Sequence, residues 1–73
     1  MVSTSSTIHV QINGETHSLT SSMALVELLE GIGMNPRLVA VEYNGEILHR
    51  QHWATTQIQN GDTLEVVTIV GGG

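Results

Sequence analysis

The stretch IHVQINGETHSL, residues 8–19, decides how this 73-residue chain begins to fold. Ile8, Val10 and Ile12 alternate with polar residues, which is the period-two pattern of a strand with one buried face. Asn13-Gly14 follows, and this pair favours a two-residue turn because both residues tolerate positive φ. The rest of the stretch then returns as an antiparallel neighbour. The sequence therefore predicts a β-hairpin.

A short amphipathic helix is predicted after the hairpin. Ser21 and Ser22 are candidate N-caps, because their hydroxyls can accept hydrogen bonds from free backbone N–H groups. The apolar stripe has the helical spacing i, i+3, i+4 and i+7, and it consists of Leu25, Leu28, Leu29 and Ile32. Gly31, Gly33 and Pro36 end the helix. Two to three turns are too few for stability alone, so we expect this helix to pack on the sheet.

Three further strands are predicted, at residues 38–43, at Ile47-Leu48 and at residues 63–70. Trp53 lies in the irregular connection between the last two, where we expect it to fill the core. The resulting order is strand, strand, helix, strand, strand, strand, which is compatible with the β-grasp arrangement. Periodicity alone predicts an α+β fold, a mixed sheet of four to five strands with one main helix packed across one face, and the specific topology needs the family resemblance given below.

The composition excludes several classes of function. Without cysteine there is no disulfide, no thiolate nucleophile and no Cys-based metal site, and we expect no metal site at the histidines either. Seven acidic residues and only Arg37 and Arg50 give a net charge of −5, which disfavours nucleic acid. The absence of lysine argues against a modifier that forms chains.

No apolar stretch is long enough to span a membrane, and the start does not resemble a signal peptide, so we expect a soluble, cytoplasmic protein. No hydrolase constellation is present, and we expect no enzymatic activity of its own.

Three regions are expected along the chain: a flexible polar lead-in at residues 1–7, a domain at residues 8–70 and an extended glycine tail at residues 71–73. A glycine tail has no Cβ atoms, so Gly71 and Gly72 can thread through a narrow channel and leave the Gly73 carboxylate unshielded. An enzyme that adenylates a carboxylate needs this access, and a sulfur nucleophile can then displace AMP. The alternative is a frayed terminus without a role.

The last predicted strand carries apolar residues in both phases. Leu64 and Val66 are expected in the core, whereas Val67 and Ile69 lie in the opposite phase. We expect Val67 and Ile69, together with Ile58, to form an exposed patch that docks a partner. The alternative is that the domain itself covers them. A solvated acidic face is also expected, and it would complement a basic partner surface; its members are Glu42, Glu46, Glu65 and Asp62.

Several segments in their order resemble the thiamine-pathway sulfur carrier family. They are Leu25-Val26-Glu27-Leu28-Leu29, Val39-Ala40-Val41-Glu42, Asn44-Gly45-Glu46-Ile47-Leu48, Arg50, Trp53, Asn60-Gly61-Asp62-Thr63-Leu64-Glu65-Val66-Val67 and Val70-Gly71-Gly72-Gly73. The resemblance covers almost the whole chain from Ile8. The chain departs from the family pattern in His49, where proline is common, and in its longer lead-in.

The resemblance implies a ubiquitin-like β-grasp fold without catalytic activity. It implies that a ubiquitin-activating-type adenylyltransferase adenylates Gly73 with ATP, which is the partner's substrate and not a cofactor of this chain. The resulting thiocarboxylate, with sulfur from a donor such as a cysteine desulfurase, then serves thiazole synthase. Two alternatives stay open: a molybdopterin-synthase small subunit or another ubiquitin-like carrier, and a β-grasp interaction module whose tail has no role.

Overall fold

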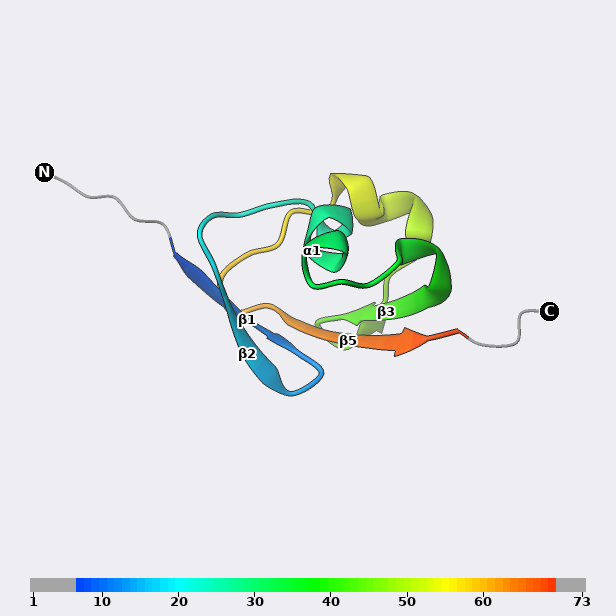
Figure 1. The fold of residues 1–73 in the computed structure, drawn as a ribbon, viewed down its shortest axis with the longest axis horizontal. Coiled ribbons are helices and arrows are strands. Elements are labelled where there is room, and N and C mark those ends of the chain that lie inside the picture. Colours follow the sequence, from blue (N-terminus) through cyan, green and yellow to red (C-terminus); the bar gives the residue numbers. More distant parts are fainter. Residues whose placement is uncertain (1–6, 70–73) are drawn as a thin grey trace, which may run out of the picture.

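The computed structural model describes residues 7–69 of the chain (Figure 1). The strands are β1 (Ile8–Ile12), β2 (Glu15–Leu19), β3 (Val39–Tyr43), β4 (Glu46–Ile47) and β5 (Thr63–Thr68). The helices are α1 (Leu25–Gly31) and the short 3₁₀ helices η1 (Pro36–Leu38) and η2 (Arg50–Thr55). None of the helices in this described part is long and apolar enough to cross a membrane.

The strands form one mixed sheet in the order β2-β1-β5-β3-β4. β1 and β5 are parallel, and the other neighbours are antiparallel. Helix α1 lies across one face of this sheet (Figure 1). The predicted β-grasp fold is thereby confirmed. So is the first hairpin, in which Asn13 and Gly14 have φ values of 53° and 84°.

The core lies between the sheet and α1. Alternate residues of the strands and the apolar stripe of the helix supply most of it, and Trp53 of η2 and Ile58 complete it. Its fully or nearly buried members are Val10, Ile12, Leu25, Leu28, Leu29, Val39, Val41, Trp53, Ile58, Leu64 and Val66. Trp53 fills the core as predicted, and its indole Nε1 donates to the carbonyl of Leu48 at 2.9 Å.

The prediction that Ile58 belongs to an exposed patch is wrong, because its side chain is 0% exposed. The Ile58 N–H donates to the Met23 carbonyl at 2.8 Å. The Ser22 hydroxyl donates to the Ile58 carbonyl at 2.7 Å. These two bonds tie the segment around Ile58 to the connection before α1, and its side chain enters the core.

The same contacts correct the predicted start of the helix. α1 begins at Leu25 with Ala24 as the N-cap, and no side-chain hydroxyl caps it. Ser22 is engaged with Ile58, and Ala24 forms an isolated antiparallel bridge with Gln57, so the chain stays extended up to Ala24. Glu27 compensates in part, because its Oε1 accepts from the Ala24 N–H at 3.2 Å.

Three of the predicted strands also differ at their ends. β3 begins at Val39, because Leu38 belongs to η1. β4 covers Glu46–Ile47, so Leu48 lies just after it, and β5 ends at Thr68. Val70, the predicted end of the last strand, lies outside the described residues, as do most of the lead-in at residues 1–7 and all of the tail at residues 71–73. The division of the chain into these three regions therefore stays a prediction.

Candidate functional site

Strand β5 is the element that leads to the glycines, and it is held on both sides. It lies between β1 and β3 in the sheet. The amide of Asn13 adds two bonds to Val66: its Nδ2 donates to the carbonyl at 3.0 Å, and its Oδ1 accepts from the N–H at 2.7 Å. On the other side, Oδ1 of Asn44 accepts from the Thr63 N–H at 2.8 Å. The strand before the tail is thus firmly fixed.

The last described contact of this segment lies one residue beyond β5. The Ile69 N–H donates to the Leu38 carbonyl at 2.6 Å. Arg50 holds the opposing segment, because its Nη2 lies 3.2 Å from the Pro36 carbonyl oxygen and 3.4 Å from that of Val39. The guanidinium also lies 5.2 Å from the ring centroid of Trp53, in cation–π range. The glycines therefore follow a well-anchored point.

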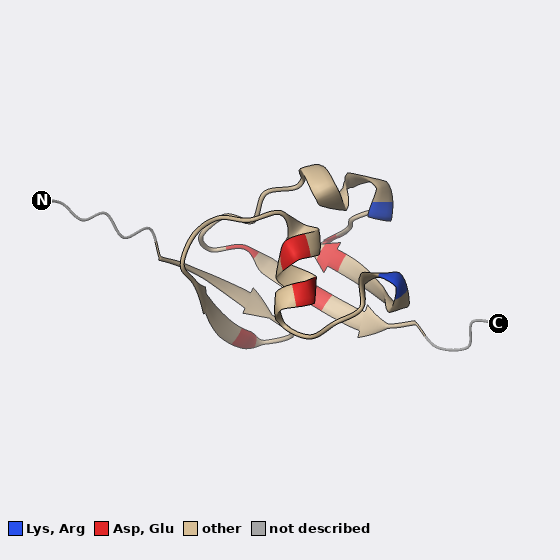
Figure 2. Ribbon diagram, turned by 45° about the horizontal axis from the view of Figure 1, so that its top comes forward, with Lys and Arg blue, Asp and Glu red and all other residues tan. Residues whose placement is uncertain are grey.

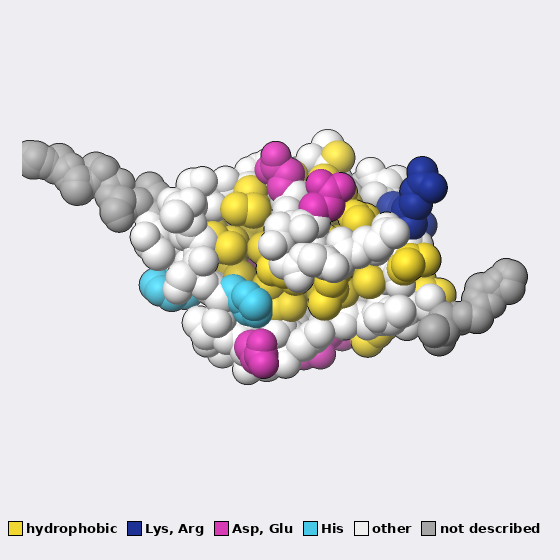
Figure 3. Space-filling model, viewed as in Figure 1, with side chains coloured by type: hydrophobic (Ala, Val, Ile, Leu, Met, Phe, Trp, Pro, Cys, Tyr) yellow, Lys and Arg dark blue, Asp and Glu magenta, His cyan; other side chains and the backbone are white. Residues whose placement is uncertain are grey.

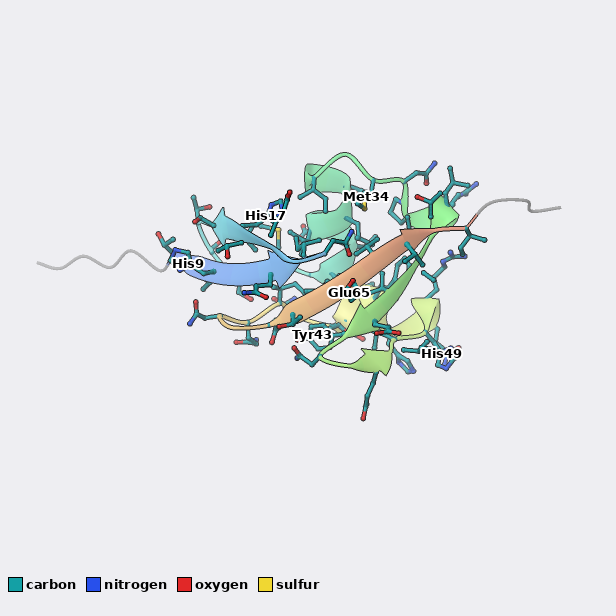
Figure 4. All side chains as sticks on the ribbon, turned by 90° about the horizontal axis from the view of Figure 1, so that it is seen from below. His9, His17, Met34, Tyr43, His49 and Glu65 are labelled. Atoms are coloured by element: carbon teal, nitrogen blue, oxygen red, sulfur yellow. The ribbon has the colours of Figure 1, made fainter. Side chains whose placement is uncertain are left out.

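The sheet face opposite α1 carries an outer apolar patch, made of Ala40, Ile47 and Val67. These residues share a shallow hollow with Glu42 and Glu65. Val67 is 59% exposed and Ile47 is 69% exposed. Figure 4 views this face and labels Glu65 on β5, which runs beside β3. This uncovered apolar surface is a candidate contact for another protein.

The charges on the molecule are unevenly placed. Glu42 and Glu65 are direct cross-strand partners on the outer face, where like charges repel. Within residues 7–69, the one ion pair is that of Glu15 and His17, so no cation of the described chain neutralises the two carboxylates. Arg37 and Arg50 lie together at the end of the molecule where β5 finishes (Figure 2). The outer apolar patch is therefore bordered by uncompensated negative charge.

Asp62 is not part of the solvated acidic face that the sequence predicted. It is buried, and its carboxylate accepts from the Tyr43 hydroxyl, from the Gln59 N–H at 2.7 Å and from the Asn44 amide at 3.2 Å. Desolvation, with the hydrogen bond and charge of Asp62, raises the pKa of Tyr43 to about 12. This network is structural: it fixes the turn that starts β5. Its only sequence signal is the Asn60-Gly61-Asp62 turn.

The structure brings together only part of the predicted site. Val67 and Ile69 are exposed, Ile69 at 48%, whereas Ile58 is in the core. Gly71, Gly72 and Gly73 lie outside the described residues. Ile47 and Ala40 were not predicted, because Ala40 is small and the outward position of Ile47 depends on how the two-residue strand β4 pairs with β3. Between residues 7 and 69, no group of three or more His, Asp or Glu side chains is placed to hold a metal.

Comparison with known proteins places this geometry in a family. The sequence profile of the ThiS family matches residues 10–73. A thiamine biosynthesis protein (ThiS) of Geobacter metallireducens has a similar solved structure, with a TM-score of 0.78 and 30% identity over 90% of this chain and 100% of that one.

Curated proteins match as well. The uncharacterized protein ycf40 of Trieres chinensis is 40% identical over 62 residues, 85% of either chain. The thiazole synthase of Paramagnetospirillum magneticum is 42% identical over 62 residues, which is 85% of this chain but 19% of that enzyme. The chain therefore spans about a fifth of the thiazole synthases that it matches. From the profile match and the solved relative it follows that this chain belongs to the ThiS family of small sulfur carrier proteins, which are not themselves enzymes.

Proposed function

We propose that this protein carries sulfur for thiamine biosynthesis as a thiocarboxylate on Gly73 and delivers it to thiazole synthase. The observation that carries the proposal is that the ThiS family match extends to the final residue and so includes all three glycines. The segments similar to this chain within two thiazole synthases support thiazole synthase as the recipient.

The chemistry divides into two steps, both on enzymes other than this one. In the first, an oxygen of the Gly73 carboxylate attacks the α-phosphorus of ATP, and pyrophosphate leaves. In the second, a hydrosulfide attacks the acyl carbon of the adenylate. AMP leaves and takes with it the carboxylate oxygen that had bonded to the α-phosphorus. The carbon therefore keeps its oxidation state. Where a desulfurase offers a persulfide instead, a thiol must reduce the S–S bond. The carrier contributes no side chain, which agrees with its lack of cysteine.

The geometry of the described residues supports a carrier that supplies the carboxylate while other enzymes carry out the chemical steps. Val67 and Ile69 of the predicted docking patch are exposed, and Ala40 and Ile47 extend the apolar surface on the sheet face that α1 leaves open. Ile69 is anchored to Leu38 directly before the last four residues of the chain. In the proposed complex, the adenylyltransferase contacts the outer apolar patch and Ile69, and it binds the glycines in its nucleotide site.

Intact-mass spectrometry tests the proposal. The protein is incubated with ATP, sulfide and the cognate adenylyltransferase, and we expect a mass gain equal to the exchange of one oxygen for one sulfur. A variant that lacks Gly73 should show no gain, whereas a control variant that lacks residues 1–6 should react like the full chain. An equal gain without Gly73 would contradict the proposal.

A second measurement distinguishes the pathway from that of other ubiquitin-like carriers. Deletion of the gene should make the cells require thiamine, and supplied thiazole should relieve that requirement. A molybdopterin-synthase small subunit would instead leave growth without thiamine unchanged. An interaction module with an inert tail would fail both this test and the mass measurement.

A further inference from the structure

Strand β2 forms one edge of the sheet, at the opposite side from β4. Among residues 7–69 it pairs only with β1, and the other edge strand, β4, is just two residues long. β2 has five residues in continuous register with β1, without a bulge, and its sequence ETHSL contains neither proline nor lysine. Natural proteins commonly use these devices to block an exposed edge, and here they are missing.

The backbone of β2 offers hydrogen-bonding groups along this edge. The two-residue turn closes on the pair Ile12 and Glu15, and the direction of the backbone groups then alternates along the strand. Thr16 and Ser18 therefore direct their N–H and C=O groups away from β1. Neither residue has a backbone hydrogen bond to any described segment outside the hairpin. An added strand would find its hydrogen-bond partners here.

An apolar groove runs beside this edge, between β2 and α1. His17 and Leu19 lie on the helix-facing side of β2, since they are opposite Val10 and Ile8. They line an open hollow together with Met23, Leu28 and Ile32. Figure 3 shows apolar side chains in yellow that stay uncovered between the helix and the hairpin. Side chains of an added strand would enter this groove at every second position.

The surroundings of the groove are acidic. Oε1 of Glu15 lies 3.8 Å from Nε2 of His17 on one side. On the other side, the exposed Glu30 directly precedes Gly31, which lines the hollow, and the exposed Glu27 lies one turn earlier on α1. The arginines are at the opposite end of the molecule, dark blue in Figure 3. The groove therefore favours an occupant with lysine or arginine. A second copy of this chain, with its net charge of −5, is disfavoured.

We propose that the edge of β2 and the adjoining groove bind an extended, apolar segment of a partner protein that carries basic residues, which adds a strand to the sheet. This interaction goes beyond the carrier function. It uses neither the outer apolar patch nor the glycines, and it would let a partner hold the carrier while the tail is engaged elsewhere.

NMR titration of the full chain tests the proposal with a capped synthetic peptide that has a valine centre and lysine ends. We expect shifts of the amides of residues 15–19 and of Met23 and Ile32, and slower hydrogen exchange at Thr16 and Ser18. A twin peptide with glutamate ends should bind about tenfold more weakly, because the groove is acidic.

Ser18→Pro is the matching variant, with Ser18→Ala as its control. Proline is tolerated on an edge where the N–H faces solvent, but it removes the donor that an added strand needs. Ser18→Pro should weaken peptide binding about tenfold and Ser18→Ala should leave it unchanged. Both variants should keep the mass gain at Gly73, so failure of this proposal is separable from failure of the carrier function.

Four results would overturn the proposal. The first is no binding of the lysine-ended peptide to the unaltered protein. The second is equal binding by Ser18→Pro. The third is a set of shifts confined to residues outside β2 and α1. The fourth is concentration-dependent self-association through β2, which would make a second copy the occupant. Should Ser18→Pro fail to fold, the exchange rates at Thr16 and Ser18 in the unaltered protein decide the question alone.

Discussion

At the residue scale, the two Asn-Gly turns show what sequence reasoning can and cannot reach. Their positive φ values, 53° at Asn13 and 52° at Asn44, were predictable because turn geometry is local. The bonds from their side chains to Val66 and Thr63 were not, because they join residues far apart in the sequence. For the same reason, Asp62 was taken for a surface acid although three groups donate to it.

The pair of Tyr43 and Asp62 leads to a prediction about alkaline stability. The folded state raises the pKa of Tyr43 from about 10 to about 12. Between these values the folded state binds more protons than the unfolded state, so the free energy of unfolding falls as the pH rises. The stabilisation from this group is complete below pH about 10 and is lost as the pH passes about 12.

Urea denaturation at a series of alkaline pH values measures this effect. Tyr43→Phe removes the titrating group and should flatten the decline of stability over that pH range relative to the unaltered protein. At neutral pH the variant should be less stable, because Asp62 loses a donor. An equally steep alkaline decline in the variant would show that another group is responsible.

At the element scale, α1 illustrates how packing overrides local preference. The apolar stripe was predicted correctly, and Leu25, Leu28 and Leu29 are all buried. The start of the helix was placed at Ser21-Ser22, which are good caps in isolation. In the folded chain, the Ser22 hydroxyl bonds to Ile58, and Ala24 bridges to Gln57. No local sequence pattern indicates that residues 57 and 58 pack against the segment before α1. The burial of Ile58 was missed for the same reason.

A helix of seven residues depends on its contacts with the core. A cavity beneath it should therefore lower the free energy of unfolding strongly. Leu29→Ala should cost about 2–5 kcal/mol, which is comparable to the ~3–5 kcal/mol of net stability that a domain of this size provides. We expect the variant to be largely unfolded by circular dichroism at room temperature. Leu29→Met conserves volume and should stay folded with a loss below about 1.5 kcal/mol. A cooperative, near-normal melt of Leu29→Ala would contradict the importance of this packing.

At the scale of the whole molecule, the number and order of the elements followed from periodicity, but the order of strands in the sheet did not. The parallel pairing of β1 with β5 joins the two ends of the domain, and periodicity does not reveal which distant strands are neighbours. The exposure of Val67 was predictable from its phase in the strand. The contribution of Ile47 was not, because it depends on how the two-residue strand β4 pairs with β3.

The outer apolar patch yields a prediction about partner binding. Val67→Asp should raise the carrier concentration needed for half-maximal ATP–pyrophosphate exchange by the adenylyltransferase about tenfold, because it buries a charge in the proposed interface. Aspartate at position 67 adds a third carboxylate beside Glu42 and Glu65, so circular dichroism must show that the variant stays folded at the assay temperature. The control Gln11→Asp adds the same charge to the same sheet face on β1 and should leave the exchange unchanged. Equal behaviour of the two variants would place the interface elsewhere.

The hydrogen bond from Ile69 to the carbonyl of Leu38 limits how far Gly73 can lie from the folded domain. Four residues follow Ile69 in the sequence, and even a fully stretched chain of four residues spans at most about 14 Å. Any enzyme that acts on the Gly73 carboxylate while this bond stays intact must therefore have its reacting atoms within that reach of the carrier's surface. The extended length of these four residues, rather than any side chain, limits how deep the nucleotide pocket of such an enzyme can lie.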